Sequence, residues 1–135
     1  FFFERWYGFD DALYAAARLL EVISGDGRYS SEIFAELPDS INTPELSIPV
    51  PEGAAHKIMH TLQESAEKAF PNAKIVDIDG IRAEYPGAWG LIRASNTTPA
   101  LVFRFEADDE ESLDKVQEVF RSIIKTILPN ASVPF

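Results

Sequence analysis

The sequence contains no cysteine, so disulfide bonds and metal sites built on thiolates are excluded. It also lacks the run of about 18 apolar residues that a transmembrane helix needs. No P-loop, G-x-G-x-x-G run or Ser/His/Asp arrangement is present, so the common signatures of nucleotide binding and nucleophilic catalysis are missing. Cysteine usage leaves the compartment open, and we expect the protein to be cytoplasmic.

Basic residues are scarce in this chain. It has 12 Lys and Arg against 22 Asp and Glu, which gives a formal net charge of −10. Nucleic acids and anionic membranes bind clusters of Lys and Arg, so we expect neither as a partner. The average field of the protein repels small anions, and an anion site therefore requires a local basic spot. Apolar residues make up 46% of the chain, which is typical of a folded globular protein.

Potential metal ligands are few and poorly spaced. His56 and His60 lie four residues apart, a spacing that can bind zinc on a helix, but no third ligand accompanies them. A solvent-exposed helix face explains them better. Asp26, Asp77 and Asp79 match no ligand spacing. We therefore expect no metal site and no catalytic residue within this chain.

The most informative polar cluster is at residues 93–99, Arg-Ala-Ser-Asn-Thr-Thr-Pro, between two strand-like runs. A guanidinium, three hydroxyls and an amide can together donate several hydrogen bonds to phosphate oxygens. Pro99 restricts the backbone at the loop exit. The cluster is therefore compatible with a phosphate-binding loop, and the residues alone leave a second interpretation open. The alternative is a polar hairpin loop whose Asn and Thr serve only turn chemistry.

The N-terminal part of the chain has a helical pattern. Residues 9–24 place apolar side chains at helical spacing, with Asp10 or Asp11 as the N-cap and Gly25 as a stop. A short helix is expected from residue 30 or 31 to Leu37. This helical pair has little to pack against within the chain itself.

Residues 38–44 contain two prolines and several turn-forming residues, and we expect them to form an interdomain hinge. Beyond the hinge the pattern predicts the order β-α-β-β-β-β-α. Short consecutive strands joined by tight turns predict an antiparallel sheet of four to five strands, with two helices on one face, an α+β domain. The expected elements are strands at 46–50, 74–78, 81–85, 88–93 and 101–106, helices at 53–70 and 108–128, and a two-residue hairpin turn at Asp79-Gly80.

Three runs of the chain resemble the α-D-phosphohexomutases, and most closely their phosphomannomutase/phosphoglucomutase branch. Arg93 to Pro99, preceded by Trp89-Gly90-Leu91-Ile92, resembles the phosphate-binding loop of that family. The N-terminal run from Phe1 to Leu20 resembles its F-F-x-E-R-[WF]-x-G-F-D-D-G-x-Y-x-A-A-R-L-L run, except that Ala12 replaces the usual Gly. Thr43-Pro44-Glu45 resembles its S-T-P-E entry to the last domain. The resemblance thus covers nearly the whole chain.

The resemblance implies phosphate contacts from Arg93, Ser95, Asn96 and Thr97. Thr98, the second Thr of the motif, is left out because we expect its side chain to face away. Phosphoglucosamine mutases typically read R-x-S-G-T-E-P at this loop. Asn96 and Thr98 therefore favour the mannose/glucose branch.

The family's sugar-recognition, phosphoserine and magnesium-binding loops are all absent from this sequence. The resemblance therefore implies a C-terminal piece of a longer enzyme. Residues 1–37 would be the remnant of a third, α/β domain, and residues 45–135 a fourth, TATA-binding-protein-like domain that clamps the substrate phosphate.

The parent enzyme implied by this resemblance interconverts hexose 1-phosphate and hexose 6-phosphate, with Mg²⁺ bound outside this chain. Its partners would be the hexose phosphate and the missing N-terminal domains of the same protein, and this chain alone would be inactive. The alternative is a stand-alone α+β anion-binding or protein-interaction module without catalysis. Within the enzyme class, the alternative is a phosphoglucosamine mutase.

Overall fold

The computed structural model describes all 135 residues, which form two compact units, Phe1–Asp39 and Ser40–Phe135. We describe each unit by itself. The boundary between them lies within the segment 38–44, where the sequence predicts a hinge. No helix in either unit combines the length and the hydropathy needed to cross a bilayer.

The first unit consists of two helices, α1 (Ala12–Asp26) and α2 (Ser30–Phe34). Asp11 is the N-cap of α1, and its carboxylate accepts hydrogen bonds from the backbone N–H groups of Leu13 (2.9 Å) and Tyr14 (3.1 Å). The helix ends at Gly27, whose φ of +79° is a left-handed conformation that favours glycine. The sequence predicted the stop two residues too early, at Gly25.

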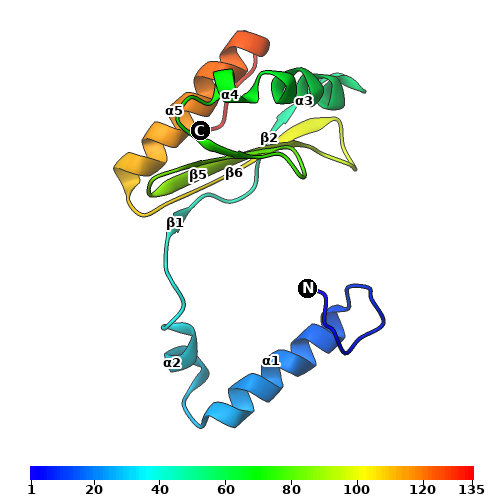
Figure 1. Cartoon of the computed structure of the whole chain (residues 1–135), viewed down its shortest axis with the longest axis vertical. Helices are drawn as coiled ribbons and strands as arrows, with labels where there is room; N and C mark the ends of the chain where they lie inside the picture. Colours follow the sequence, from blue (N-terminus) through cyan, green and yellow to red (C-terminus); the bar gives the residue numbers. More distant parts are fainter. The chain divides into compact units, whose positions relative to one another are not determined.

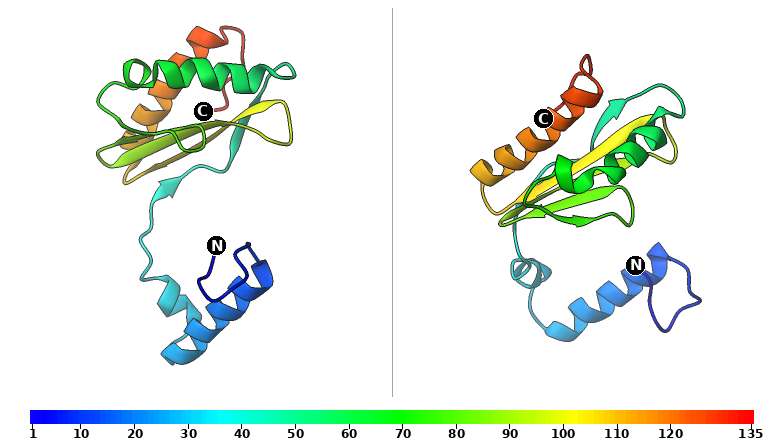
Figure 2. Two further views of the ribbon diagram at one scale, coloured as in Figure 1. Left: turned by 45° about the vertical axis from the view of Figure 1, so that its right-hand side comes forward. Right: turned by 45° about the horizontal axis from the view of Figure 1, so that its top comes forward.

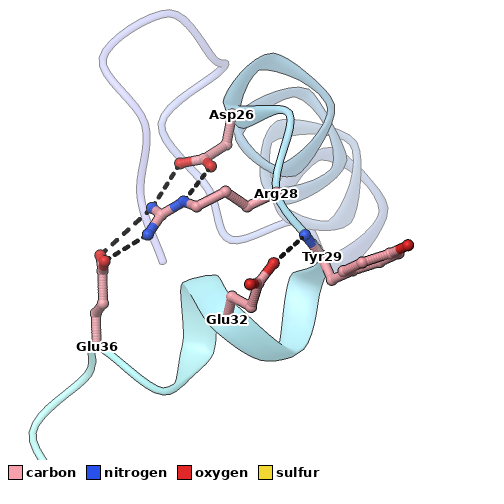
Figure 3. Close-up of polar contacts among 5 residues, drawn as sticks. All are labelled: Asp26, Arg28, Tyr29, Glu32 and Glu36. Atoms are coloured by element: carbon pink, nitrogen blue, oxygen red, sulfur yellow. Dashed lines mark hydrogen bonds and ion pairs between the residues drawn. The ribbon is translucent and has the colours of Figure 1, made fainter.

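Arg28 connects the two helices of the first unit (Figure 3). Its Nε and Nη2 atoms donate to the two carboxylate oxygens of Asp26, at 2.5 and 2.8 Å, and its Nη1 atom pairs with Glu36 beyond α2. Glu32 accepts a hydrogen bond from the Tyr29 backbone at 2.9 Å. These polar contacts hold a unit in which no residue is buried.

The second unit is a single antiparallel sheet with its helices on one face (Figures 1 and 2). The order of the strands is β1-β6-β5-β4-β3, and β2 pairs with another part of β6. This confirms the predicted α+β class. The strands are β1 (Ile41–Asn42), β2 (Leu46–Pro49), β3 (Lys74–Val76), β4 (Ile81–Tyr85), β5 (Ala88–Ala94) and β6 (Ala100–Ala107), and the helices are α3 (Ala54–Glu64), α4 (Ala66–Ala69) and α5 (Glu110–Ile127).

The core lies between the sheet and these helices. Alternate side chains along each strand point to one face, as the period of two requires. On β5, Gly90, Ile92 and Ala94 are buried, whereas Trp89, Leu91 and Arg93 point to the face that carries no helix of this unit. A Cβ atom at Gly90 would lie 2.5 Å from the Phe120 ring of α5, so glycine allows this close packing.

The structure differs from the sequence expectations in three places. The helix predicted at 53–70 is divided at Ser65, whose hydroxyl bonds the carbonyl of Thr61 at 3.2 Å, an arrangement that bends helices. Strand β1 lies inside the segment predicted as a connector, because Ile41 pairs with Ala107 of β6. The sheet therefore has six strands, where four to five were expected.

The third difference is the turn at Asp79-Gly80. The last pair between β3 and β4 is Val76 with Arg82, so five residues, 77–81, close the hairpin, and Ile81 already belongs to β4. The prediction of a two-residue type I′ turn is wrong. That turn needs a positive φ at both central residues, and Asp79 does not have one.

Candidate phosphate-binding loop

The polar run predicted as a phosphate site forms the hairpin loop between β5 and β6, drawn in yellow in Figure 1. Ala94 pairs with Leu101, and the Ser95 N–H donates to the Ala100 carbonyl at 2.9 Å. The Pro99 carbonyl accepts from Val50, next to β2, at 2.9 Å. The loop is therefore fixed at both ends by the sheet.

Ser95 organises the interior of the loop. Its hydroxyl oxygen accepts from the Thr98 N–H at 3.2 Å and forms a hydrogen bond with the Thr98 hydroxyl at 3.0 Å. The Thr97 N–H lies 3.4 Å from the same oxygen. The Thr98 hydroxyl is thus turned toward Ser95, within the loop. Side chains from Asn96 to Pro99 are exposed.

The Arg93 guanidinium is on the face of the sheet without helices, and 29% of its side chain is exposed. It donates no hydrogen bond to another protein group. The nearest carboxylate is that of Glu45, with Oε2 3.8 Å from Nη2. The Asn96 amide also has no side-chain partner. The guanidinium and amide donors are therefore available to an anion, beside a loop in which the Ser95 and Thr98 hydroxyls are hydrogen-bonded to each other.

Gly80, the residue just before β4, lies next to Arg93 of β5, whereas the sequence indicated only a turn at this glycine. Ile81 pairs with Ile92, so Gly80 lies beside Arg93. The Gly80 carbonyl also accepts a 3.3 Å hydrogen bond from Gln63 of α3. The sequence shows the glycine, but its contact with Arg93 follows from the register of β4 on β5, which the sequence alone does not give.

A second polar cluster lies on the same open face, at residues of β3, β4 and β5. Glu84 accepts hydrogen bonds from Lys74 (3.0 Å) and Arg82 (2.9 Å). Both cations lower the pKa of the Glu84 carboxyl below its usual range, and Lys74 has the larger effect. Arg82 also lies 3.8 Å from the centroid of the Trp89 ring. A hollow of about 310 Å³ beside it is lined by three carboxylates, and its one cation is already paired. This hollow therefore suits an anion poorly.

The other candidate ligands remain apart. No three His, Cys, Asp or Glu side chains in the structure lie close enough together to hold a metal ion. His56 and His60 are exposed on α3, and the nearest carboxylate to His60 is Glu64, with Nδ1 3.7 Å from Oε1. This arrangement agrees with a solvent-exposed helix face.

Comparison with known proteins links this loop to one family. The profile described as "Phosphoglucomutase/phosphomannomutase, C-terminal domain" matches residues 45–123. The chain is 49% identical over 135 residues to the phosphomannomutase/phosphoglucomutase of Pseudomonas aeruginosa PAO1. This match covers 100% of the chain and 29% of that protein. It is 51% identical over 127 residues to the phosphoglucomutase of Neisseria meningitidis serogroup B, covering 93% of this chain and 27% of that protein.

A solved structure supports the same relationship. A phosphoglucomutase/phosphomannomutase family protein from Burkholderia thailandensis superposes with a TM-score of 0.81 at 43% sequence identity. The match covers 100% of this chain and 28% of that chain. This chain therefore spans less than a third of the length of the relatives it matches.

Proposed function

Because the chain belongs to the phosphoglucomutase/phosphomannomutase family, we propose that it is the C-terminal part of a phosphohexomutase and that its β5–β6 loop holds a substrate phosphate. The enzyme would interconvert hexose 1-phosphate and hexose 6-phosphate. Arg93, Ser95, Asn96 and Thr97 would contact the phosphate that is not being transferred.

The observation that carries this proposal is the guanidinium of Arg93, which donates no hydrogen bond within the protein and has only a loose ion pair with Glu45, at the base of a loop ordered by the Ser95–Thr98 hydrogen bonds. A guanidinium offers five N–H donors in a planar fork that matches two phosphate oxygens. The exposed side chains of Asn96 and Thr97 add neutral donors. In a chain of net charge −10, this loop is a local basic spot of the kind that an anionic ligand needs.

In this role the loop acts by binding and orienting. Contacts to the distant phosphate would use binding energy to place the sugar for reaction at its other end. Hydrogen bonds from neutral donors and one Arg can be broken and remade, so the same loop could hold either end of a sugar that must turn over during the cycle.

The remaining catalytic groups would belong to the part of the protein outside this chain. Mg²⁺, when bound, would neutralise charge on the transferred phosphoryl group. The residues described here do not fit such an ion, since no three of their His, Cys, Asp or Glu side chains lie close enough together to hold it. We therefore expect the 135-residue chain to have no mutase activity by itself.

The first unit supports the proposal of a longer enzyme. Several of its large apolar side chains are exposed, among them Phe1 (94%), Leu13 (84%) and Leu20 (66%). An apolar surface of this kind usually marks an interaction site. We propose that the N-terminal domains of the same protein cover it.

Titration with inorganic phosphate, followed by amide NMR shifts, tests the proposed site. Amides from 93 to 98 should shift, with a Kd on the order of millimolar, because one Arg and a few neutral donors must offset the entropy of association. Arg93→Ala should remove most of this response. Shifts confined to other regions would refute the proposed site and favour a module with a different role.

A further inference from the structure

The Thr43-Pro44-Glu45 run, which precedes β2, is fixed to the sheet beside the phosphate loop. Thr43 is held against β6 by three hydrogen bonds. Its N–H donates to the Phe105 carbonyl (3.0 Å), its hydroxyl accepts from the Phe105 N–H (3.2 Å), and its carbonyl accepts from the Arg104 side chain (3.2 Å). The backbone just before Glu45 is therefore fixed to the sheet.

This anchor places Glu45 on the same face as Arg93. Val102 of β6 pairs with Ser47 on one side and with Arg93 on the other. Glu45 is two residues before Ser47, and the period of two puts both on the helix-free face. The Glu45 carboxylate then reaches diagonally across β6 to the Arg93 guanidinium, at 3.8 Å.

The contact between Glu45 and Arg93 is a loose ion pair. Its distance is too long for a hydrogen bond, and 61% of the Glu45 side chain is exposed. Exposed pairs of this kind contribute little to stability. An anion that binds Arg93 more strongly can therefore displace the Glu45 carboxylate, and the exposed side chain is free to move into solvent.

We propose that Glu45 sets the affinity and charge selectivity of the phosphate loop, an inference that rests on the proposed function. In the ligand-free protein its carboxylate lies 3.8 Å from the guanidinium that phosphate must use, without a hydrogen bond to it. A doubly charged phosphate group, bound through two oxygens, displaces it, whereas a singly charged anion competes poorly. The repulsion that remains weakens binding and speeds the release of phosphate.

A phosphate titration of three proteins tests this role: the 135-residue chain, Glu45→Gln and Glu67→Gln. Glu67 is an exposed residue of α4 without an ion pair, so its variant controls for the loss of one negative charge. The Kd for inorganic phosphate at residues 93–98 should fall roughly twofold to fivefold in Glu45→Gln, as expected for one exposed charge. It should change little in Glu67→Gln.

Salt gives a second readout. Because the effect is electrostatic, the gain in Glu45→Gln should shrink when sodium chloride is raised to about 0.5 M, where screening is strong. Glu45→Gln should also bind sulfate and monoanionic phosphodiesters better than the unsubstituted chain does. Glu45→Ala removes the same charge and repeats the measurement if the Gln variant folds poorly.

Each result decides the question. If Glu45→Gln binds phosphate as the parent chain does, Glu45 has no influence on the site. Weaker binding would mean that Glu45 holds the guanidinium in place, which also overturns the proposal. An equal gain in Glu67→Gln would attribute the effect to net charge. If phosphate shifts no amide from 93 to 98 in any of these proteins, the proposed function fails first and this inference with it.

Discussion

Gly80 lies directly against the backbone of Arg93. A Cβ atom on Gly80 would be 2.6 Å from the Cβ atom of Arg93 and 2.2 Å from the carbonyl oxygen of Ile92, and the φ of Gly80 is +82°. No side chain can be placed there without moving β5 or the β3–β4 loop. The position of the proposed phosphate-binding Arg is thus coupled to a glycine at the end of the β3–β4 loop.

Replacing Gly80 by Ala should weaken phosphate binding at residues 93–98. The added methyl group pushes against the strand end that carries Arg93, and the positive φ adds about 1–2 kcal/mol of backbone strain. Gly87→Ala is the matched control, since Gly87 has a φ of +74° in the turn at the other end of β5 and meets Asp108. Both variants should lose thermal stability, measured by circular dichroism. Equal Kd values for phosphate in the two variants would show that Gly80 does not position Arg93.

In the full-length enzyme, Arg93→Ala should lower kcat/KM for a hexose 1-phosphate by roughly tenfold to a thousandfold, the worth of one or two charge-assisted hydrogen bonds. Arg93→Lys should recover only part of this loss, because an ammonium group cannot form the bidentate contact. Lys68→Ala, at an exposed position of α4, should leave the kinetics unchanged. Phosphorylation of the enzyme, followed by mass spectrometry, should survive all three substitutions. Unchanged kinetics in Arg93→Ala would contradict the role of the loop as a phosphate clamp.

The second unit should fold without the first. Every buried core residue lies between Ile48 and Ile124, so residues 40–135 should show a single cooperative thermal transition. A shorter piece, residues 45–135, lacks β1 and the hydrogen bonds between Thr43 and Phe105, and we expect a lower Tm for it. Differential scanning calorimetry of the two pieces makes the comparison. A transition that is lost already in residues 40–135 would show that the first unit shares its core.

The N-cap of α5 should make stability depend on pH in the acid range. The Asp109 carboxylate accepts a 2.7 Å hydrogen bond from the Ser112 N–H, and this bond lowers its pKa below the ordinary value of 3.8. Its contribution is therefore fully present above pH 3.8 and is lost as the pH falls through the lower pKa of the folded state. Asp109→Asn keeps a capping acceptor without the charge, so its Tm should vary less between pH 5 and pH 2. Identical pH profiles for the two proteins would exclude this contribution.

Local pattern predicted much of the second unit. Strand-like runs bounded by turn residues located β4, β5 and β6, and helical spacing located α5. The order of residues 93–99 placed the candidate site on the β5–β6 hairpin before any strand was paired. These features depend on neighbours in the sequence, because periodicity and turn chemistry act over a few residues.

The tertiary structure decided which distant residues meet. Strand β6 pairs with β5, β2 and β1, and this shared pairing brings Glu45 to Arg93, although 47 residues separate them in the sequence. The register of β4 on β5 likewise sets Gly80 against Arg93, where the sequence alone suggested only a tight turn. Side-chain period and turn residues are local properties, whereas register and strand order follow from burying one apolar face of the sheet under α3 and α5. The sequence therefore identified the polar loop, and the packing of the whole unit determined which side chains surround it.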